Sequence, residues 1–146
     1  MRRFEVISSW QGRGINLPAR KTRLSAGYDL EAGERVVLAP GAVTLVPTGL
    51  KAYMNPDEVL QIFIRSSFAV KSNLALANST AIIDADYVDN PANEGHLMLP
   101  LLNRGQEPIT IEKGQRIAQG IFFKYLCTDD DNAEGERQGG FGSTGQ

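Results

Sequence analysis

The sequence has few of the features that mark disulfide-bonded, membrane-spanning or nucleic-acid-binding proteins. It contains one cysteine, Cys127, in 146 residues, which excludes an internal disulfide and the usual structural zinc site and favours a reducing compartment. Its longest notable apolar run, residues 97–102, is far too short to cross a bilayer as a helix. The formal net charge of -2 gives no general attraction to nucleic acid, so any anion site must be local. We therefore expect a soluble, cytoplasmic protein without direct nucleic-acid or membrane contacts.

Helix-like spacing is also scarce, because it occurs only in RSSFAVKS at residues 65–72. Turn signals such as PTG and NPD recur at short intervals, and apolar or alternating runs lie between them. These runs predict strands at 35–38, 42–46, 58–64, 74–77, 96–102, 108–111 and 116–123. Many short strands with one short helix predict an all-β fold, a distorted jelly roll or β-sandwich.

The composition changes after Leu126. An acidic run, DDD, is followed by a Gly-rich polar segment with almost no side chain that could join a core. We therefore predict a domain over residues 1–127 and a flexible arm over 128–146. A disordered tail is the alternative that composition favours, although Phe141, flanked by glycine on both sides, is unusual for one.

Two polar segments in the first half of the chain could bind anions or metal. SAGYDL (25–30) contains Asp29, and an ordinary turn is its simplest interpretation. IRSSFAVK (64–71) ends a strand and begins a helix with Arg65 and two serines. Free N–H groups, hydroxyls and a guanidinium make such a position an anion site. An ordinary serine N-cap is the alternative.

Three later segments are also candidates. NSTAIIDADY (78–87) places Asp84 after an apolar strand, where partial desolvation would suit a general base, or where it could be a solvated turn residue. GQRIAQGIF (114–122) places Arg116 and Gln119 in an otherwise apolar strand, or on its polar face. RQGGFGSTGQ (137–146) combines an arginine, hydroxyls and glycine-rich backbone that can approach phosphate closely.

Together, these five segments resemble the five ordered motifs of trimeric dUTPases, over residues 25–145. VPTGL at 46–50 is a further family-like turn. The resemblance implies a jelly-roll homotrimer with three active sites at subunit interfaces, each closed by the exchanged C-terminal arm of another subunit. It also implies hydrolysis of dUTP to dUMP and diphosphate with Mg²⁺, which supplies dUMP for thymidylate synthesis and keeps uracil out of DNA.

The resemblance implies three catalytic residues. Asp84 would orient and deprotonate the water that attacks the α-phosphorus. Ser66 would lie near the bridging oxygen that leaves, and Gln119 would bond the water or the phosphate chain. Asp29 would reach Mg²⁺ through water, with the ion itself on the triphosphate.

The substrate-binding residues follow from the same resemblance. Uracil would be bound by Asn78 and the backbone of Ile82 and Ile83, and the sugar by Tyr87 and Met98. The phosphates would be gripped by Arg65, Ser66 and Ser67. In the arm, Phe141 would stack over uracil, while Arg137, Gly142, Ser143 and Thr144 would close on the β- and γ-phosphates.

The chain departs from the family pattern in three places. Ala81 replaces a usual glycine, residues 88–95 are longer than the expected hairpin, and Arg137 lies four residues before Phe141. Outside these motifs, we expect His96 at the surface or in a subunit contact, and Cys127 as a small packing residue.

Two rival functions are alternatives to dUTP hydrolysis. A dCTP deaminase has the same fold but carries a glutamate on the strand where this chain has Pro100, so deamination is rejected. A regulatory nucleotide-sensing interaction protein is the other alternative. Loss of activity would predict degraded motifs, whereas Asp84, Tyr87 and the arm are all present.

Overall fold

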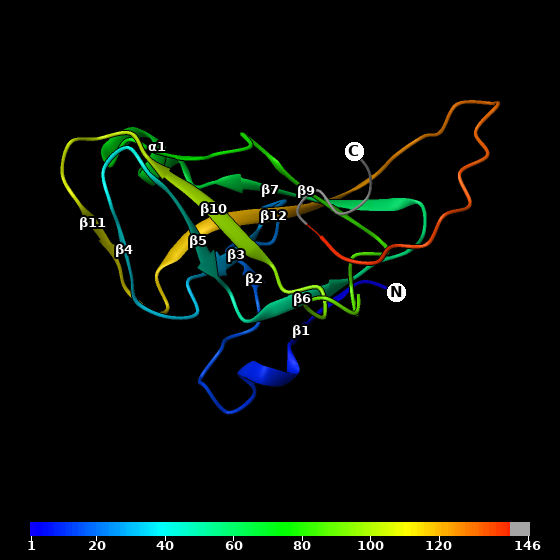
Figure 1. Cartoon of the computed structure of the whole chain (residues 1–146), viewed down its shortest axis with the longest axis horizontal. Coiled ribbons are helices and arrows are strands. Elements are labelled where there is room, and N and C mark those ends of the chain that lie inside the picture. Colours follow the sequence, from blue (N-terminus) through cyan, green and yellow to red (C-terminus); the bar gives the residue numbers. More distant parts are fainter. Residues whose placement is uncertain (141–146) are drawn as a thin grey trace.

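The largest unit of the fold is an antiparallel five-stranded sheet with the order β2-β3-β12-β7-β9 (Figure 1). The computed structural model describes residues 1–140 of the chain. The strands of this sheet are β2 (Ala19–Arg20), β3 (Tyr28–Glu31), β12 (Arg116–Lys124), β7 (Glu58–Ile64) and β9 (Ala81–Asp84). The fourth strand in this order, β7, lies between the long strand β12 and the edge strand β9.

A three-stranded sheet, β5-β10-β8, forms the second layer of the sandwich. Its strands are β5 (Val43–Pro47), β10 (Met98–Asn103) and β8 (Leu74–Leu76). Two strand pairs complete the β structure of residues 1–140: β1 (Arg3–Val6) with β6 (Leu50–Tyr53), and β4 (Val36–Leu38) with β11 (Ile109–Ile111). The helical elements are the 3-10 turn η1 (Ser8–Trp10) and the α-helix α1 (Ser66–Lys71).

One apolar core joins the two layers. Leu60 and Ile62 of β7 and Leu99 and Leu101 of β10 are fully buried members of the same cluster. Burial alternates along β10, because successive side chains of a strand point to opposite faces. The residues between the buried leucines therefore face away from the core, and that other face of β10 is available to a ligand.

The sequence predicted the fold class and most of its elements. All seven predicted strands and the helix are present, with small differences at their ends. The strands β1, β2, β3 and β6 were not predicted, since they are two to four residues long, which is too short for a periodicity to stand out. The turn alternative for Asp29 is wrong, because Asp29 lies within β3.

The chain leaves the body after β12 and returns to it. The backbone N–H of Tyr125 donates to Asp57 at 3.1 Å, and the side chain of Leu126 is then fully exposed. The segment that follows swings outward and comes back toward β9 (Figure 1). Cys127 is exposed, so its expected packing role is wrong. No helix within residues 1–140 has the length and apolarity needed to span a membrane.

His96 is buried, contrary to the expectation of a surface position. Its Nε2 accepts a hydrogen bond from the backbone N–H of Gly49 at 2.9 Å, and its ring packs on Trp10 with centroids 5.6 Å apart. Accepting this bond requires the neutral imidazole. Burial lowers the pKa of His96 from 6.5 to about 4, so the folded chain keeps this side chain unprotonated at neutral pH.

The depressed pKa of His96 predicts a loss of stability in mild acid. Between pH 6.5 and about 4 the unfolded chain binds a proton that the folded chain does not, so the free energy of unfolding must fall as the pH is lowered. The full effect is about 3 kcal/mol. Urea unfolding at several pH values measures it. His96→Gln, which keeps an acceptor but does not titrate, should give a flatter profile, and an equally steep profile would contradict this origin.

Candidate active site

A pocket of about 240 Å³ lies between β9, the turn after it and the outer face of β10. We call it the hairpin pocket. Its lining residues are Asn78, Ala81, Ile82, Ile83, Asp84, Tyr87, Met98, Pro100, Arg137 and Gly140. The alternation of β10 explains the presence of Met98 and Pro100, since both lie on the face opposite the buried leucines.

The hairpin pocket has an apolar wall and a polar rim. Tyr87 is only 6% exposed and Ala81 only 5%. Ala81 pairs with Ile62 in regular β structure, so the alanine that replaces the family's usual glycine takes an extended backbone that any residue adopts. The side chain of Ile82 is 55% exposed, which leaves an apolar surface beside the pocket for a ligand or a second chain.

Asp84 lies at the rim of this pocket rather than in an apolar environment. Its side chain is 55% exposed, so the partial desolvation expected from the preceding apolar strand is wrong. The strand does position it: the backbone N–H of Tyr87 donates to the carbonyl of Asp84 at 3.1 Å, and this turn directs the carboxylate outward. A carboxylate at this position is accessible to water and to a phosphate.

The arm folds back onto Asp84 of the same chain. The Arg137 side chain donates through Nη2 to Asp84 at 2.5 Å and through Nε to Asp86 at 2.7 Å. Its guanidinium carbon lies 5.8 Å from the centre of the Tyr87 ring. Gly140 follows so closely that an added Cβ would come within 2.4 Å of that ring. In this chain Arg137 therefore pairs with two carboxylates and is not part of the second, anion-binding pocket described next.

A second pocket, of about 390 Å³, lies at the other end of the five-stranded sheet. We call it the anion pocket. Its lining residues are Lys21, Ser25, Gly27, Asp29, Arg65, Ser66, Ser67 and Gln119. The N-cap of α1 is Arg65, and no side chain caps the helix within the described chain, so the serine N-cap alternative is wrong. Ser66 and Ser67 are instead the first two residues of α1, and both line the pocket.

Strand register brings the polar groups of the anion pocket together. Asp29 of β3 is paired with Gln119 of β12. Its carboxylate lies 4.0 Å from Nε of Arg65 and 3.6 Å from Nη1 of Arg116. Gly27 is required beside them, because a Cβ there would come within 2.3 Å of Oε1 of Gln119. Two guanidinium groups around a single carboxylate give the pocket an excess of positive charge.

The two pockets have no lining residue in common and lie at opposite ends of β7. Asp84 is in register with Val59 at the start of that strand, whereas Arg65 follows its last residue. A seven-residue strand spans roughly 20 Å at about 3.3 Å per residue. Asp84 of one chain is therefore too far from Arg65 of that same chain to act on a phosphate held there.

The structure divides the predicted site residues into two groups. Asn78, Ile82, Ile83, Asp84, Tyr87, Met98 and Arg137 line the hairpin pocket, and Asp29, Arg65, Ser66, Ser67 and Gln119 line the anion pocket. The predictions for Phe141, Gly142, Ser143 and Thr144 fall outside the described residues.

Sequence reasoning missed several members of both pockets. Lys21, Ser25 and Gly27 line the anion pocket, and Pro100 and Gly140 line the hairpin pocket. Gly27 lies in SAGYDL and Gly140 in RQGGFGSTGQ, so a glycine near the charged residue of each motif could have indicated these two positions. Nothing in the sequence pointed to Lys21. The place of Pro100 in the pocket lining agrees with the rejection of deamination, since it leaves no carboxylate there.

A dedicated protein cage for a metal ion is absent from residues 1–140, where no three Asp, Glu, His or Cys side chains are grouped as ligands. Asp29 is the carboxylate that lines the anion pocket. Mg²⁺ commonly keeps several waters and is bound through one or two carboxylates together with substrate phosphates. The donor set therefore fits a magnesium ion that arrives with a polyphosphate.

A pocket with an amide and exposed strand backbone, together with a basic pocket lined by hydroxyls, defines a protein that binds a phosphorylated ligand. The family model for dUTPase matches residues 13–145. The chain is 52% identical to the deoxyuridine 5'-triphosphate nucleotidohydrolase of Lactococcus lactis over 99% of its length and 98% of that protein. It belongs to the dUTPase family.

Solved structures agree with this assignment. The crystal structure of dUTPase from Streptococcus mutans superposes with a TM-score of 0.83 at 44% identity and covers 87% of this chain and 98% of its own. A mutant dUTPase of the Staphylococcus aureus phage phi11, described with a structural Mg(II) ion, gives a TM-score of 0.74 at 19% identity over 92% of this chain and 97% of its own. At that identity the phage protein shows the shared fold alone.

Replacement of Gly27 by alanine should disturb the anion pocket specifically. The added Cβ would displace the side chain of Gln119, and a shift of about 1 Å in a positioning group can cost up to 10²-fold. We expect Gly27→Ala to weaken binding of inorganic pyrophosphate about tenfold by calorimetry, with little change in melting temperature. Gly105→Ala is the control, since it meets only Asn103 at 3.3 Å. Unchanged pyrophosphate affinity in Gly27→Ala would refute this role of the close packing.

Proposed function

We propose that this protein is a dUTP diphosphatase that hydrolyses dUTP to dUMP and diphosphate. The observation that carries the proposal is the placement of Asp84, an accessible carboxylate at the rim of a pocket of nucleoside size. Membership of the dUTPase family supports the substrate. A cytoplasmic location is part of the proposal, since the single cysteine favours a reducing compartment.

The hairpin pocket binds the deoxyuridine in this proposal. Asn78 and the backbone of Ile82 and Ile83 offer amide donors and acceptors to the edge of uracil. Tyr87 presents a buried ring to the sugar, with Met98 on the neighbouring wall. Because polar groups that a bound base covers are costly when left unpaired, such a site discriminates strongly against a base with a different hydrogen-bonding edge.

The anion pocket binds the triphosphate. Arg65, Ser66 and Ser67 donate to its oxygens, with Ser66 placed near the bridging oxygen that leaves. Asp29 would hold Mg²⁺, and the bound ion would supply charge neutralisation to the phosphates. Gln119, over Gly27, orients the attacking water or the phosphate chain.

In the reaction, the oxygen of a water attacks the α-phosphorus in line. Asp84 accepts the proton of that water, the bond from the α-phosphorus to its bridging oxygen breaks, and diphosphate leaves. Arg137 must first release Asp84, because the carboxylate oxygen that accepts from the guanidinium at 2.5 Å must be free to accept from the water. The phosphate oxygens provide Arg137 with alternative anionic partners.

A complete site requires a second chain. Asp84, the proposed general base, is separated from the anion pocket of its own chain by the length of β7. The nucleotide must therefore be held between the hairpin pocket of one subunit and the anion pocket of the next. A closed homotrimer satisfies this arrangement three times with one repeated heterologous contact. The arm over 128–146 then closes over the assembled site of another subunit and excludes water once the nucleotide is bound.

Removal of the proposed base should abolish turnover and leave binding intact. We expect Asp84→Asn to lower kcat about 10²- to 10⁴-fold while a non-hydrolysable dUTP analogue binds with similar affinity. Asp86→Asn is the matched control, because Asp86 also pairs with Arg137 and is also exposed but does not line the hairpin pocket. Near-normal turnover in Asp84→Asn would remove this residue from the mechanism.

Mixing two inactive variants tests the shared site. Chains with Asp84→Asn keep the anion pocket, and chains with Arg65→Ala keep the base. After unfolding and joint refolding, random trimers should contain one intact combination at about one interface in four, and activity should return to roughly a quarter of the wild-type value. Differently tagged chains verify mixing. Mixed trimers without activity would contradict a site divided between chains.

The proposed homotrimer also predicts the mass of the wild-type protein in solution. Light scattering should give about three times the chain mass of 15.9 kDa.

A further inference from the structure

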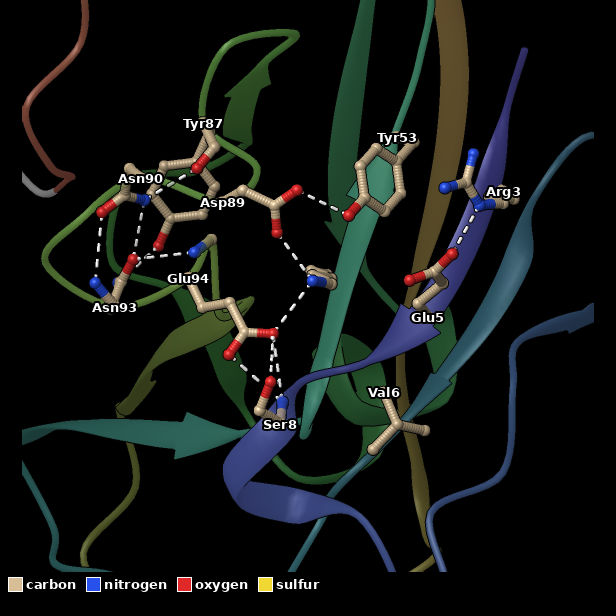
Figure 2. A network of polar contacts seen from close by, with 12 residues as sticks. Arg3, Glu5, Val6, Ser8, Tyr53, Tyr87, Asp89, Asn90, Asn93 and Glu94 are labelled. Atoms are coloured by element: carbon tan, nitrogen blue, oxygen red, sulfur yellow. Dashed lines mark hydrogen bonds and ion pairs between the residues drawn. The ribbon is translucent and has the colours of Figure 1, made fainter.

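The loop over residues 88–95, longer than the family's usual hairpin, is held in one shape by its own side chains. Asn90 is its centre: Oδ1 accepts from the backbone N–H groups of Ala92 at 3.0 Å and Asn93 at 3.1 Å. Its Nδ2 donates to the carbonyl of Tyr87 at 2.7 Å and to Oδ1 of Asn93 at 2.8 Å (Figure 2). The amide of Asn90 thus makes three hydrogen bonds within the loop and one to Tyr87.

The backbone of the loop is equally constrained. Asp89, Glu94 and Gly95 have φ values of 59°, 62° and 83°, in the left-handed region that costs most residues free energy. A Cβ on Gly95 would come within 2.7 Å of Cα of Val88. Such backbone conformations persist only where surrounding contacts determine them, so this loop is a folded element and not a loose connection.

Lys51 of β6 attaches the loop to the body of the protein. Its Nζ donates to Asp89 at 2.6 Å and to Glu94 at 2.9 Å, and its side chain is only 10% exposed. Asp89 also accepts from the hydroxyl of Tyr53 at 2.6 Å, and Glu94 from the backbone N–H of Ser8 at 3.0 Å (Figure 2). Lys51 therefore clamps both ends of the loop onto the β1–β6 pair.

The pKa values of these groups agree with a clamp that stays charged. Burial would lower the pKa of Lys51, but the hydrogen bonds to Asp89 and Glu94 outweigh it, and the pKa is raised. The hydrogen bond from Lys51 lowers the pKa of both Asp89 and Glu94. The three charges therefore persist together through the neutral range.

The other side of the loop fixes the hydroxyl of Tyr87. That hydroxyl donates to the carbonyl of His96 at 2.7 Å and accepts from Nδ2 of Asn93 at 2.9 Å. The ring of the same tyrosine is buried and lines the hairpin pocket. With its donor and acceptor both engaged by the protein, this hydroxyl is not needed to bind a ligand, and the tyrosine meets the ligand as a fixed apolar wall.

We propose that the 88–95 loop is a brace that sets the position of Tyr87 against the sugar, with Asn93 and Lys51 as its positioning residues. The proposal rests on the proposed function, in which Tyr87 contacts the deoxyribose. A fixed wall rejects a 2'-hydroxyl by the space it denies, so discrimination depends on how firmly the ring is held. Asn93 and Lys51 touch no substrate, yet they control the preference for deoxyribose.

The test measures the ratio of kcat/KM for dUTP to kcat/KM for UTP. Asn93→Ala removes one bond to the Tyr87 hydroxyl and should lower this ratio about five- to tenfold, mainly through a gain in UTP turnover. Tyr87→Phe removes the hydroxyl itself and should lower the ratio comparably. The double variant should lower it no further than Tyr87→Phe alone, because Tyr87→Phe already removes the contact that Asn93→Ala removes.

Two substitutions of Lys51 separate the effect of its charge from the effect of its aliphatic stem. Lys51→Met keeps the aliphatic stem and removes the clamp, so the ratio should again fall, whereas Lys51→Arg should restore most of it. Lys113→Met is the control, since Lys113 is an exposed lysine that bonds the Arg13 carbonyl away from both pockets. Melting temperatures of all variants separate a loss of folding from a loss of discrimination. If Lys51→Met does not fold, Asn93→Ala decides the question.

Tyr87→Ala distinguishes failure of the brace from failure of the proposed function. If Tyr87→Ala lowers the ratio while Asn93→Ala and Lys51→Met leave it unchanged, the brace is overturned and the sugar contact stands. If Tyr87→Ala also leaves the ratio unchanged, the role of Tyr87 is overturned together with the brace, although hydrolysis of dUTP would still stand. A decrease of the dUTP-to-UTP ratio in Tyr87→Ala, Asn93→Ala and Lys51→Met alike supports the proposal.

Discussion

The antiparallel register of β7 with its two neighbours is the constraint on which the rest of the site depends. β12 on one side places Gln119 opposite Phe63 near the end of β7, and β9 on the other places Asp84 opposite Val59 near its start. Because a strand cannot shorten, Asp84 and Arg65 are kept at opposite ends of β7 within one chain. Assembly is therefore a requirement of the chemistry in the proposed function, and not an addition to a site that is already complete.

The residues that sequence reasoning found are those whose polarity conflicts with their surroundings. Asp84 follows an apolar strand, Gln119 interrupts one, and Arg65 precedes a short helix, so local patterns were sufficient to single them out. The same local patterns misjudged the environment of Asp84, since an edge strand leaves one side open to solvent and the sequence does not state which strands are edges.

The residues that sequence reasoning missed depend on contacts between distant segments. Lys51 is a single charge in a short strand, and its partners lie 38 and 43 residues later in the chain. His96 is buried because Trp10 and Gly49 meet it from two other elements. No periodicity records such contacts. The length of the 88–95 loop was visible in the sequence, but its rigidity arises from asparagine side chains whose partners only the fold reveals.

The contact between Arg137 and Asp84 also makes the arm a tethered competitor of the nucleotide. A guanidinium attached to the same chain is present near that carboxylate at a high effective concentration. A ligand that needs the free carboxylate can bind only while the contact is broken, so its apparent affinity is reduced by the fraction of the protein in that open state. Nucleotide affinity and the length of residues 128–136 are therefore linked properties. A longer tether lowers the effective concentration of Arg137 at Asp84 and so weakens the competitor.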